Sequence, residues 1–107
     1  MNRPIAFNDG SCGIWQLKGR TLEKKLGQFD FKEETVGIKA YTEFNLIGKE
    51  VEKAISIPYN MLIKNGHVVV IEDEQYEITL CQKKDTFPLS WRLTLSKTPL
   101  RYSYAEV

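Results

Sequence analysis

The side chains that could do nucleophilic, acid–base or metal chemistry are few in this chain and far apart. There is one histidine, His67, and there are two cysteines, Cys12 and Cys81. The cysteines are too distant for a CxxC pair and too few for a disulfide framework, which indicates reduced thiols that pack as small hydrophobic side chains. His67 follows a turn at the start of an apolar run, where we expect a solvent-exposed spacer.

The acidic residues form no pattern that is typical of catalysis. They gather as Glu33–Glu34, as Glu72–Asp73–Glu74 and as Glu50 with Glu52, and turns or strand ends account for the first two groups. A pair of acid–base carboxylates is the minor alternative, because nothing marks one of them as buried. The motifs GxxxxGK[ST], GxGxxG and GxSxG are missing, and NDGSCG lacks the lysine of a phosphate loop. We predict no catalytic, cofactor-binding or metal-binding residue, and a protein that is not an enzyme.

Length and charge limit the number of domains and the classes of partner. A chain of 107 residues fits one domain with a modest core. Fifteen basic residues against fourteen acidic ones give a net charge of +1, which supplies no overall field for nucleic acid or an anionic membrane. The N-terminus has no apolar leader and no window is long enough to span a membrane, so we expect a protein made and kept in the cytosol or in what is assembled there.

Period-two alternation predicts strands along most of the chain. In residues 34–44 one face carries Val36, Ile38, Ala40 and Phe44. In residues 51–58 it carries Val51, Ile55 and Ile57, and Lys53 is expected near the start of that strand, where its stem covers apolar surface. Pro58 ends the strand because it has no N–H for the ladder.

A hairpin and a last strand follow. The pair Asn65–Gly66 predicts a tight turn with positive φ values. VVVI, residues 68–71, is apolar on both faces and should be a central strand. After the acidic turn 72–74, the expected inward residues are Tyr76, Ile78 and Leu80 in one strand and Trp91, Leu93 and Leu95 in the next, while Glu77, Thr79, Cys81, Arg92, Thr94 and Ser96 face outward.

Helix is scarce in this pattern. RTLEKKLG, residues 20–27, is the best candidate, because Leu22 and Leu26 are four apart and Gly27 could end the helix. The sequence therefore predicts a mainly β fold, a small antiparallel β-barrel or sandwich of five to six strands with at most one short helix. Within this one domain we expect an N-terminal strand and short helix or arm in residues 1–27, a barrel core in 28–97 and a C-terminal interface arm in 98–107.

Aromatic residues interleaved with basic ones raise a second class, a nucleic-acid-binding small barrel. Such a protein could stack bases on Tyr41, Phe44, Tyr59 or Tyr76. Most of these side chains fall on expected core faces, however, and a net charge of +1 releases few counterions from a phosphate backbone. Core packing accounts for the same aromatic residues more simply.

With the strands in order, the chain resembles the small head–tail joining proteins of tailed bacteriophages, the head-completion or stopper family. The residues that carry the likeness are Ile55-Ser56-Ile57-Pro58, the hairpin of Val68 to Ile71 with Tyr76-Glu77-Ile78, and the final strand Leu93 to Ser96. The likeness covers about residues 28–97, and FNDGSCGIWQ resembles the start of some members from phages of Gram-positive hosts. It is a likeness of pattern, without a catalytic signature.

The resemblance implies a structural protein of the virion, made in the bacterial cytoplasm, in which identical subunits form a ring. That ring would lie between the portal or adaptor protein and the tail proteins, close the DNA channel after packaging, and touch DNA only in passing, with no membrane involved. Family stoppers use the excursion between two early strands as a channel loop. By position this is the segment Thr42 to Lys53, with candidate channel or inter-subunit residues Thr42, Glu43, Phe44, Asn45, Leu46, Ile47, Gly48, Lys49 and Glu50, and a surface loop is the alternative.

Two further segments are candidates for contact with neighbouring subunits. The C-terminal residues Leu100, Arg101, Tyr102 and Tyr104 lie in a stretch too short for its own core, so we expect an interface arm, with a frayed tail as the alternative. The acidic turn Glu72, Asp73 and Glu74 is the second candidate. A tail-completion or minor capsid protein of the same virion is an alternative to the connector, because these parts share small β-rich folds.

Overall fold

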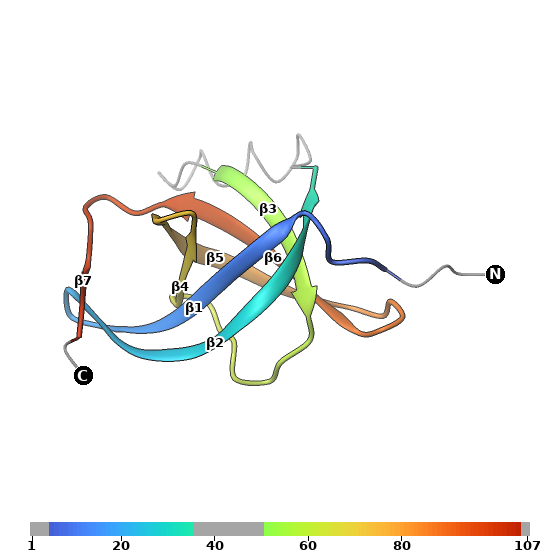
Figure 1. Ribbon diagram of the computed structural model, residues 1–107, viewed down its shortest axis with the longest axis horizontal. Coiled ribbons are helices and arrows are strands. Elements are labelled where there is room, and N and C mark those ends of the chain that lie inside the picture. The colour runs from blue at the N-terminus through green and yellow to red at the C-terminus, as the bar shows by residue number, and fades with distance from the viewer. Residues whose placement is uncertain (1–4, 36–50, 106–107) are drawn as a thin grey trace.

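Alternating sequence patterns become strands along nearly the whole of the described chain. The computed structural model describes residues 5–35 and 51–105, which contain seven strands and no helix (Figure 1). The strands are β1 (Gly10–Lys18), β2 (Thr21–Glu34), β3 (Val51–Pro58), β4 (Val68–Ile71), β5 (Glu74–Lys84), β6 (Ser90–Lys97) and β7 (Ser103–Tyr104). The prediction of a mainly β protein is confirmed.

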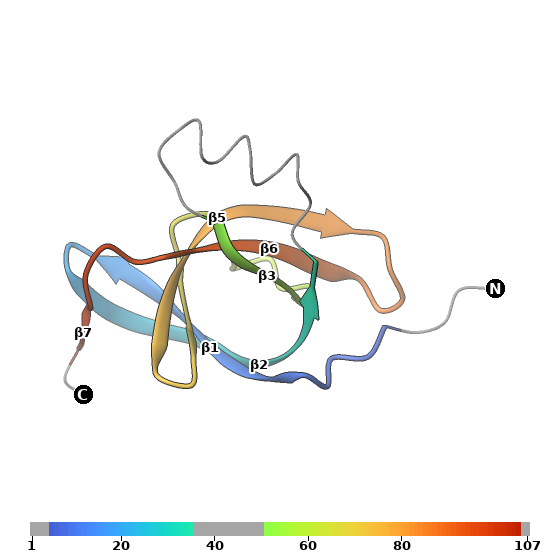
Figure 2. The same ribbon diagram turned by 90° about the horizontal axis from the view of Figure 1, so that it is seen from above.

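The strands pair in a ring. The order β1–β4–β5–β6–β3–β2 closes on itself because β1 also pairs with β2, and all six of these pairings are antiparallel. Figure 2 shows β1 and β2 along one side of the ring and β3, β5 and β6 along the other. Two of the pairings, β1 with β4 and β2 with β3, are only three residue pairs long, so the ring is less regular than a fully laddered barrel. The short strand β7 adds to β2 in parallel, outside the ring.

One hydrophobic core fills the ring. The expected inward residues Ile55 and Ile57 of β3, Ile78 of β5, and Leu93 and Leu95 of β6 are all fully buried. They pack with residues that the sequence pattern did not assign to the core, among them Ile14, Phe31 and Ile63. The core therefore receives side chains from the N-terminal hairpin as well as from residues 28–97. Of the expected strand over residues 34–44, only Glu34 and Thr35 lie within the described residues.

The expected helix over residues 20–27 is wrong, because residues 21–27 belong to β2 and Arg20 lies in the turn before it. The strand is 14 residues long and forms a hairpin with β1 that contains two register shifts. At these shifts Glu23 and Leu26 have no partner across the ladder, since Leu22 pairs with Leu17, Lys24 with Gln16, and Gly27 with Ile14. An extra residue in one strand interrupts the alternation of faces, so Glu23, Lys24 and Lys25 are all exposed between Leu22 and Leu26, a pattern that also fits a helix.

A β-bulge also explains why the expected faces of β5 are partly wrong. A register shift between Ile78 and Leu80 leaves Thr79 without a partner residue in β6, and its hydroxyl donates to the carbonyl of Thr94 over 2.9 Å. Beyond the bulge Cys81 packs against the core, whereas Leu80 is only half-buried. In β6 the expected outward residues Thr94 and Ser96 are buried too, so that this strand is covered on both faces.

The two predicted turns exist and differ in their backbone. Gly66 has φ of +91°, but Asn65 does not share the positive φ expected for the pair; instead its side-chain oxygen accepts the backbone N–H of Cys81. The acidic turn has positive φ at two non-glycine residues, 49° at Glu72 and 69° at Asp73. VVVI is the interior strand expected, because β4 lies between β1 and β5.

A polar clasp stands where the ring closes between β2 and β3. The hydroxyl of Ser56 donates to the carboxylate of Glu34 over 2.8 Å, and the guanidinium of Arg92 lies 3.8 Å from the same carboxylate. Arg92 also donates to the carbonyl of Thr35 over 2.6 Å. The side chains of Arg92 and Glu34 are 23% and 22% exposed, so water screens this pair only in part. One carboxylate therefore links β2, β3 and β6.

Replacing a core residue of the N-terminal hairpin should destabilise the whole domain. We expect Ile14→Ala to lower the free energy of unfolding by about 2–5 kcal/mol, because it removes a fully buried side chain and leaves a cavity. Leu100→Ala removes an apolar side chain that is 45% exposed, so it is the control and should cost much less. Urea unfolding measures both, and equal small losses would contradict a core that includes β1.

The clasp predicts unequal effects of two neighbouring glutamates. Glu34→Ala should cost about 1–2 kcal/mol of unfolding free energy, because it leaves the buried Ser56 hydroxyl without its acceptor and removes the carboxylate beside the Arg92 guanidinium. Glu33 faces Lys53 at 3.7 Å but its side chain is 63% exposed, so Glu33→Ala should cost less than about 0.5 kcal/mol. Thermal unfolding of the two variants would refute the clasp if Glu33→Ala were the more damaging one.

Candidate functional site

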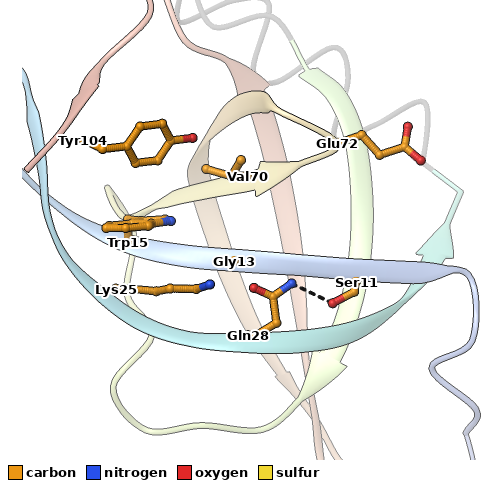
Figure 3. Close-up of a pocket in the computed structure, with 8 residues that line it drawn as sticks. All are labelled: Ser11, Gly13, Trp15, Lys25, Gln28, Val70, Glu72 and Tyr104. Carbon is orange, nitrogen blue, oxygen red and sulfur yellow. Dashed lines mark hydrogen bonds between the residues drawn. The ribbon is translucent and has the colours of Figure 1, made fainter.

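The outer surface of β1, β2 and β4 carries a shallow hollow, here called the aromatic hollow, of ≈ 310 Å³. Strand alternation places its residues: Ser11, Gly13 and Trp15 are every second residue of β1, Lys25 and Gln28 come from β2, and Val70 comes from β4. Glu72 and Tyr104 complete its lining (Figure 3). The hollow thus joins three neighbouring strands, the acidic turn and the C-terminal segment.

Trp15 is the centre of this hollow. The ring of Tyr104 meets it edge to face with centroids 5.1 Å apart, and the ammonium of Lys25 lies 6.0 Å from the centroid of the indole (Figure 3). Beside them the amide of Gln28 donates to the hydroxyl of Ser11 over 2.7 Å. Aromatic faces, an ammonium and neutral polar groups bind planar or polar ligands by stacking and hydrogen bonds, and they offer no nucleophile with a base beside it.

Gly13 forms the floor of the aromatic hollow. A Cβ at this position would lie 3.2 Å from Cε of Lys25, 3.3 Å from Oε1 of Gln28 and 3.4 Å from Nε1 of Trp15. These distances are tight, so a larger side chain would displace all three neighbours. The missing side chain of Gly13 is therefore what leaves the hollow open.

The C-terminal segment is fastened to its own chain by a buried glutamine. Gln75 is 4% exposed; its amide donates to the carbonyl of Tyr102 over 2.9 Å, and its carbonyl oxygen accepts the N–H of Tyr102 over 2.7 Å. The hydroxyl of Thr98 and the N–H of Ala105 add bonds to the carbonyls of Gln75 and Leu22. Residues 98–105 are thus held at both ends, and a frayed tail is wrong for this part of the chain.

Arg101 brings together two segments that the sequence named separately. Its guanidinium donates to the backbone carbonyl of Asp73 over 2.9 Å and to the carboxylate of Asp73 over 2.8 Å. The bond to this carboxylate raises the pKa of Arg101. The acidic turn and the C-terminal arm therefore form one surface, on which Glu72, Asp73, Glu74 and Leu100 are exposed.

Exposed apolar side chains gather at the other end of the molecule. Tyr59 follows β3, and its N–H donates to the carbonyl of Leu89 in the loop between β5 and β6. The exposed fractions are 36% for Tyr59, 70% for Phe87 and 41% for Leu89. Tyr59 also packs on Trp91 with ring centroids 5.0 Å apart. We call these three residues the loop-end patch.

The thiols and the histidine have structural surroundings. Burial, with a smaller contribution from the Asp30 carboxylate, raises the pKa of Cys12 to about 12, and burial raises the pKa of Cys81 to about 11. Both thiols are therefore protonated at neutral pH and are poor nucleophiles. Because the unfolded thiols ionise at lower pH, the stability that their burial supplies is complete below about pH 9 and is lost as the pH rises toward 11 and 12.

His67 is part of a turn rather than an exposed spacer. Its Nδ1 accepts the backbone N–H of Lys64 over 3.1 Å, and it is partly buried. Burial and the nearby Lys64 ammonium lower the pKa of His67, which favours the neutral ring that this bond needs. This group stabilises the fold above its ordinary pKa, and the contribution is lost as the pH falls through the lowered value.

Only some of the candidate residues named from the sequence lie within the described part of the chain. Thr42 to Glu50 lie outside the described residues, so the channel-loop prediction stays a prediction. Of the residues proposed for base stacking, Tyr76 packs against the core, Tyr59 belongs to the loop-end patch, and Tyr41 and Phe44 lie outside the described residues. Sequence reasoning missed the aromatic hollow, although the alternation of Ser11, Gly13 and Trp15 within a strand could have indicated one outward face.

Residues 5–35 and 51–105 contain no group of three or more His, Cys, Asp and Glu side chains that could hold a metal ion. The same residues contain no helix long and apolar enough to cross a membrane.

Removing the two hydrogen bonds between the Gln75 side chain and Tyr102 should free the C-terminal arm without unfolding the ring. In Gln75→Ala we expect amide hydrogens of residues 102–105 to exchange much faster, because Tyr102 loses both bonds to the side chain. Gln82→Ala, an exposed glutamine of the same strand, is the control and should leave this exchange unchanged. Hydrogen exchange followed by mass spectrometry tests this. An arm that stays protected in Gln75→Ala would refute the role of Gln75 in holding the arm.

Comparison with known proteins gives no match, neither to a family model nor to a curated protein or a solved structure.

Proposed function

We propose that this chain is a structural virion protein of a tailed bacteriophage, a part of the head–tail connector. It joins the portal and capsid to the tail and closes the DNA channel after packaging. Copies of the chain form a ring, with the portal or adaptor protein on one side and tail proteins on the other. The sequence resemblance over residues 28–97 motivates this proposal.

The observation that carries the proposal is the presence of two unlike exposed surfaces at opposite ends of the molecule. The loop between β5 and β6, which bears most of the loop-end patch, lies at one end, and β7 lies at the other in both views (Figures 1 and 2). At the β7 end, Tyr104 is 38% exposed beside Trp15 and the acidic turn. A joining protein needs different surfaces for two different partners, and exposed aromatic residues are enriched at protein interfaces.

The strand ring also has the properties of a structural scaffold. Strand ladders give a rigid frame, and the contact-bearing side chains stand in loops and turns at its margins, where they can vary without disturbing the core. The hydrogen-bonded ladders of the ring leave short edges, which limits unplanned association between sheets. A connector needs such a frame because it transmits position from the head to the tail.

A nucleic-acid-binding barrel is the second candidate, and the aromatic hollow is the observation that favours it. Trp15, Tyr104 and Lys25 combine aromatic rings with an ammonium on an outer strand face, as surfaces that stack bases do. This candidate predicts binding of single-stranded oligonucleotide that falls steeply with salt. It also predicts that Trp15→Ala weakens this binding. No measurable binding at low salt would exclude it.

Electron microscopy of particles that lack the protein tests the connector. Disruption of its gene should give capsids that leak or retain DNA beside separate, complete tails, and supply of the intact gene from a plasmid should restore joined particles. A plasmid copy with Phe87→Asp and Leu89→Asp should fail to restore them, because charges in the loop-end patch oppose docking. Joined, infectious particles without any copy of the gene would overturn the proposal, and the tail-completion alternative predicts defective tails instead.

A further inference from the structure

A second hollow, here called the basic hollow, opens beside the start of β4. Its volume is ≈ 430 Å³, and its lining residues are Gln16, Lys24, Leu26, Met61, Leu62, Lys64 and His67. Met61 is 76% and Leu62 is 55% exposed, so apolar surface is offered to solvent between two lysines. The lining includes no acidic side chain among the residues that the structure describes. The hollow therefore fits a ligand that carries both carboxylates and an apolar side chain.

The acidic turn has the complementary character. Glu72, Asp73 and Glu74 are exposed at its tip. Glu74 and Leu100 line one further hollow together, and Leu100 is 45% exposed. The bond from Arg101 to Asp73 fixes the turn against the arm that carries Leu100. We call Glu72, Asp73, Glu74 and Leu100 the acidic knob.

We propose that the basic hollow of one copy of this chain receives the acidic knob of a second copy. Lys24 and Lys64 then face Glu72 and Glu74 of the neighbour, while Met61 and Leu62 cover its Leu100. The two surfaces lie at opposite ends of β4, because the loop with Met61 precedes that strand and the turn follows it. A contact between two different patches is heterologous, so it repeats from copy to copy and builds a ring if the rotation closes.

This contact rests on the proposed function and gives it the lateral interface of the ring. It leaves the loop-end patch at one end and the exposed Tyr104 ring at the other for different partners. Opposite charges on the two surfaces attract and orient the copies, and like charges at the same places repel, so charge reversal is the sharpest test.

Sedimentation velocity at low salt tests the contact with four variants. The natural chain should associate as its concentration rises, and more weakly as salt is added. Lys24→Glu with Lys64→Glu, and separately Glu72→Lys with Glu74→Lys, should each weaken association by at least about tenfold. All four substitutions in one chain should restore it. Arg20→Glu with Lys84→Glu, which changes the charge of two exposed residues elsewhere, is the control and should associate like the natural chain.

Several results would overturn the contact. They are a natural chain that stays monomeric at its highest soluble concentration, reversal variants that associate normally, and a control that is weakened equally. Loss of oligonucleotide binding in Lys24→Glu with Lys64→Glu, with unchanged self-association, would assign the hollow to nucleic acid. Circular dichroism verifies the fold of each variant. None of these results bears on particles without the gene, so the contact can fail while the connector stands.

Discussion

Closure of the strand ring is the constraint on which the rest of this structure depends. An open sheet would expose an edge strand on each side, and exposed edges invite pairing with other chains. Two of the six pairings in the closed ring are only three residue pairs long. Ile14 secures one of them from inside the core, and Glu34 secures the other from outside by holding Ser56 and Arg92. Burial thus supports the short pairing of β1 with β4, and a partly buried carboxylate supports the short pairing of β2 with β3.

In the closed ring, the residues that stabilise the fold differ from those that are available for contact with partners. Core side chains face inward from all six strands, whereas the exposed large apolar side chains lie in the loops and the C-terminal arm. The C-terminal arm does both, because its hydrogen bonds to Gln75 and Asp73 hold it to the ring while its side chains Leu100 and Tyr104 remain exposed. A protein built in this way can present several surfaces at fixed positions, which is what a part of a larger assembly requires.

The sequence predicts the class of this fold and the strands β3 to β6, because their alternation is plain and Ile55, Ile57, Leu93 and Leu95 behave as period two requires. It mispredicts β2 as a helix, and the outward face of Cys81, for one shared reason. β-bulges at Glu23, Leu26 and Thr79 shift the alternation, and no residue type marks a bulge reliably. The two hollows were not predicted either, because each combines residues from strands whose register follows only from the closed ring.

The central claim is that this chain is a structural link whose copies meet one another side by side. Its most direct test is a cryo-electron microscopy reconstruction of the head–tail junction in particles that contain the protein. The account predicts a ring of copies of this fold between head and tail, with Glu72 and Glu74 of each copy at Lys24 and Lys64 of the next. A junction whose density excludes this fold would contradict the account.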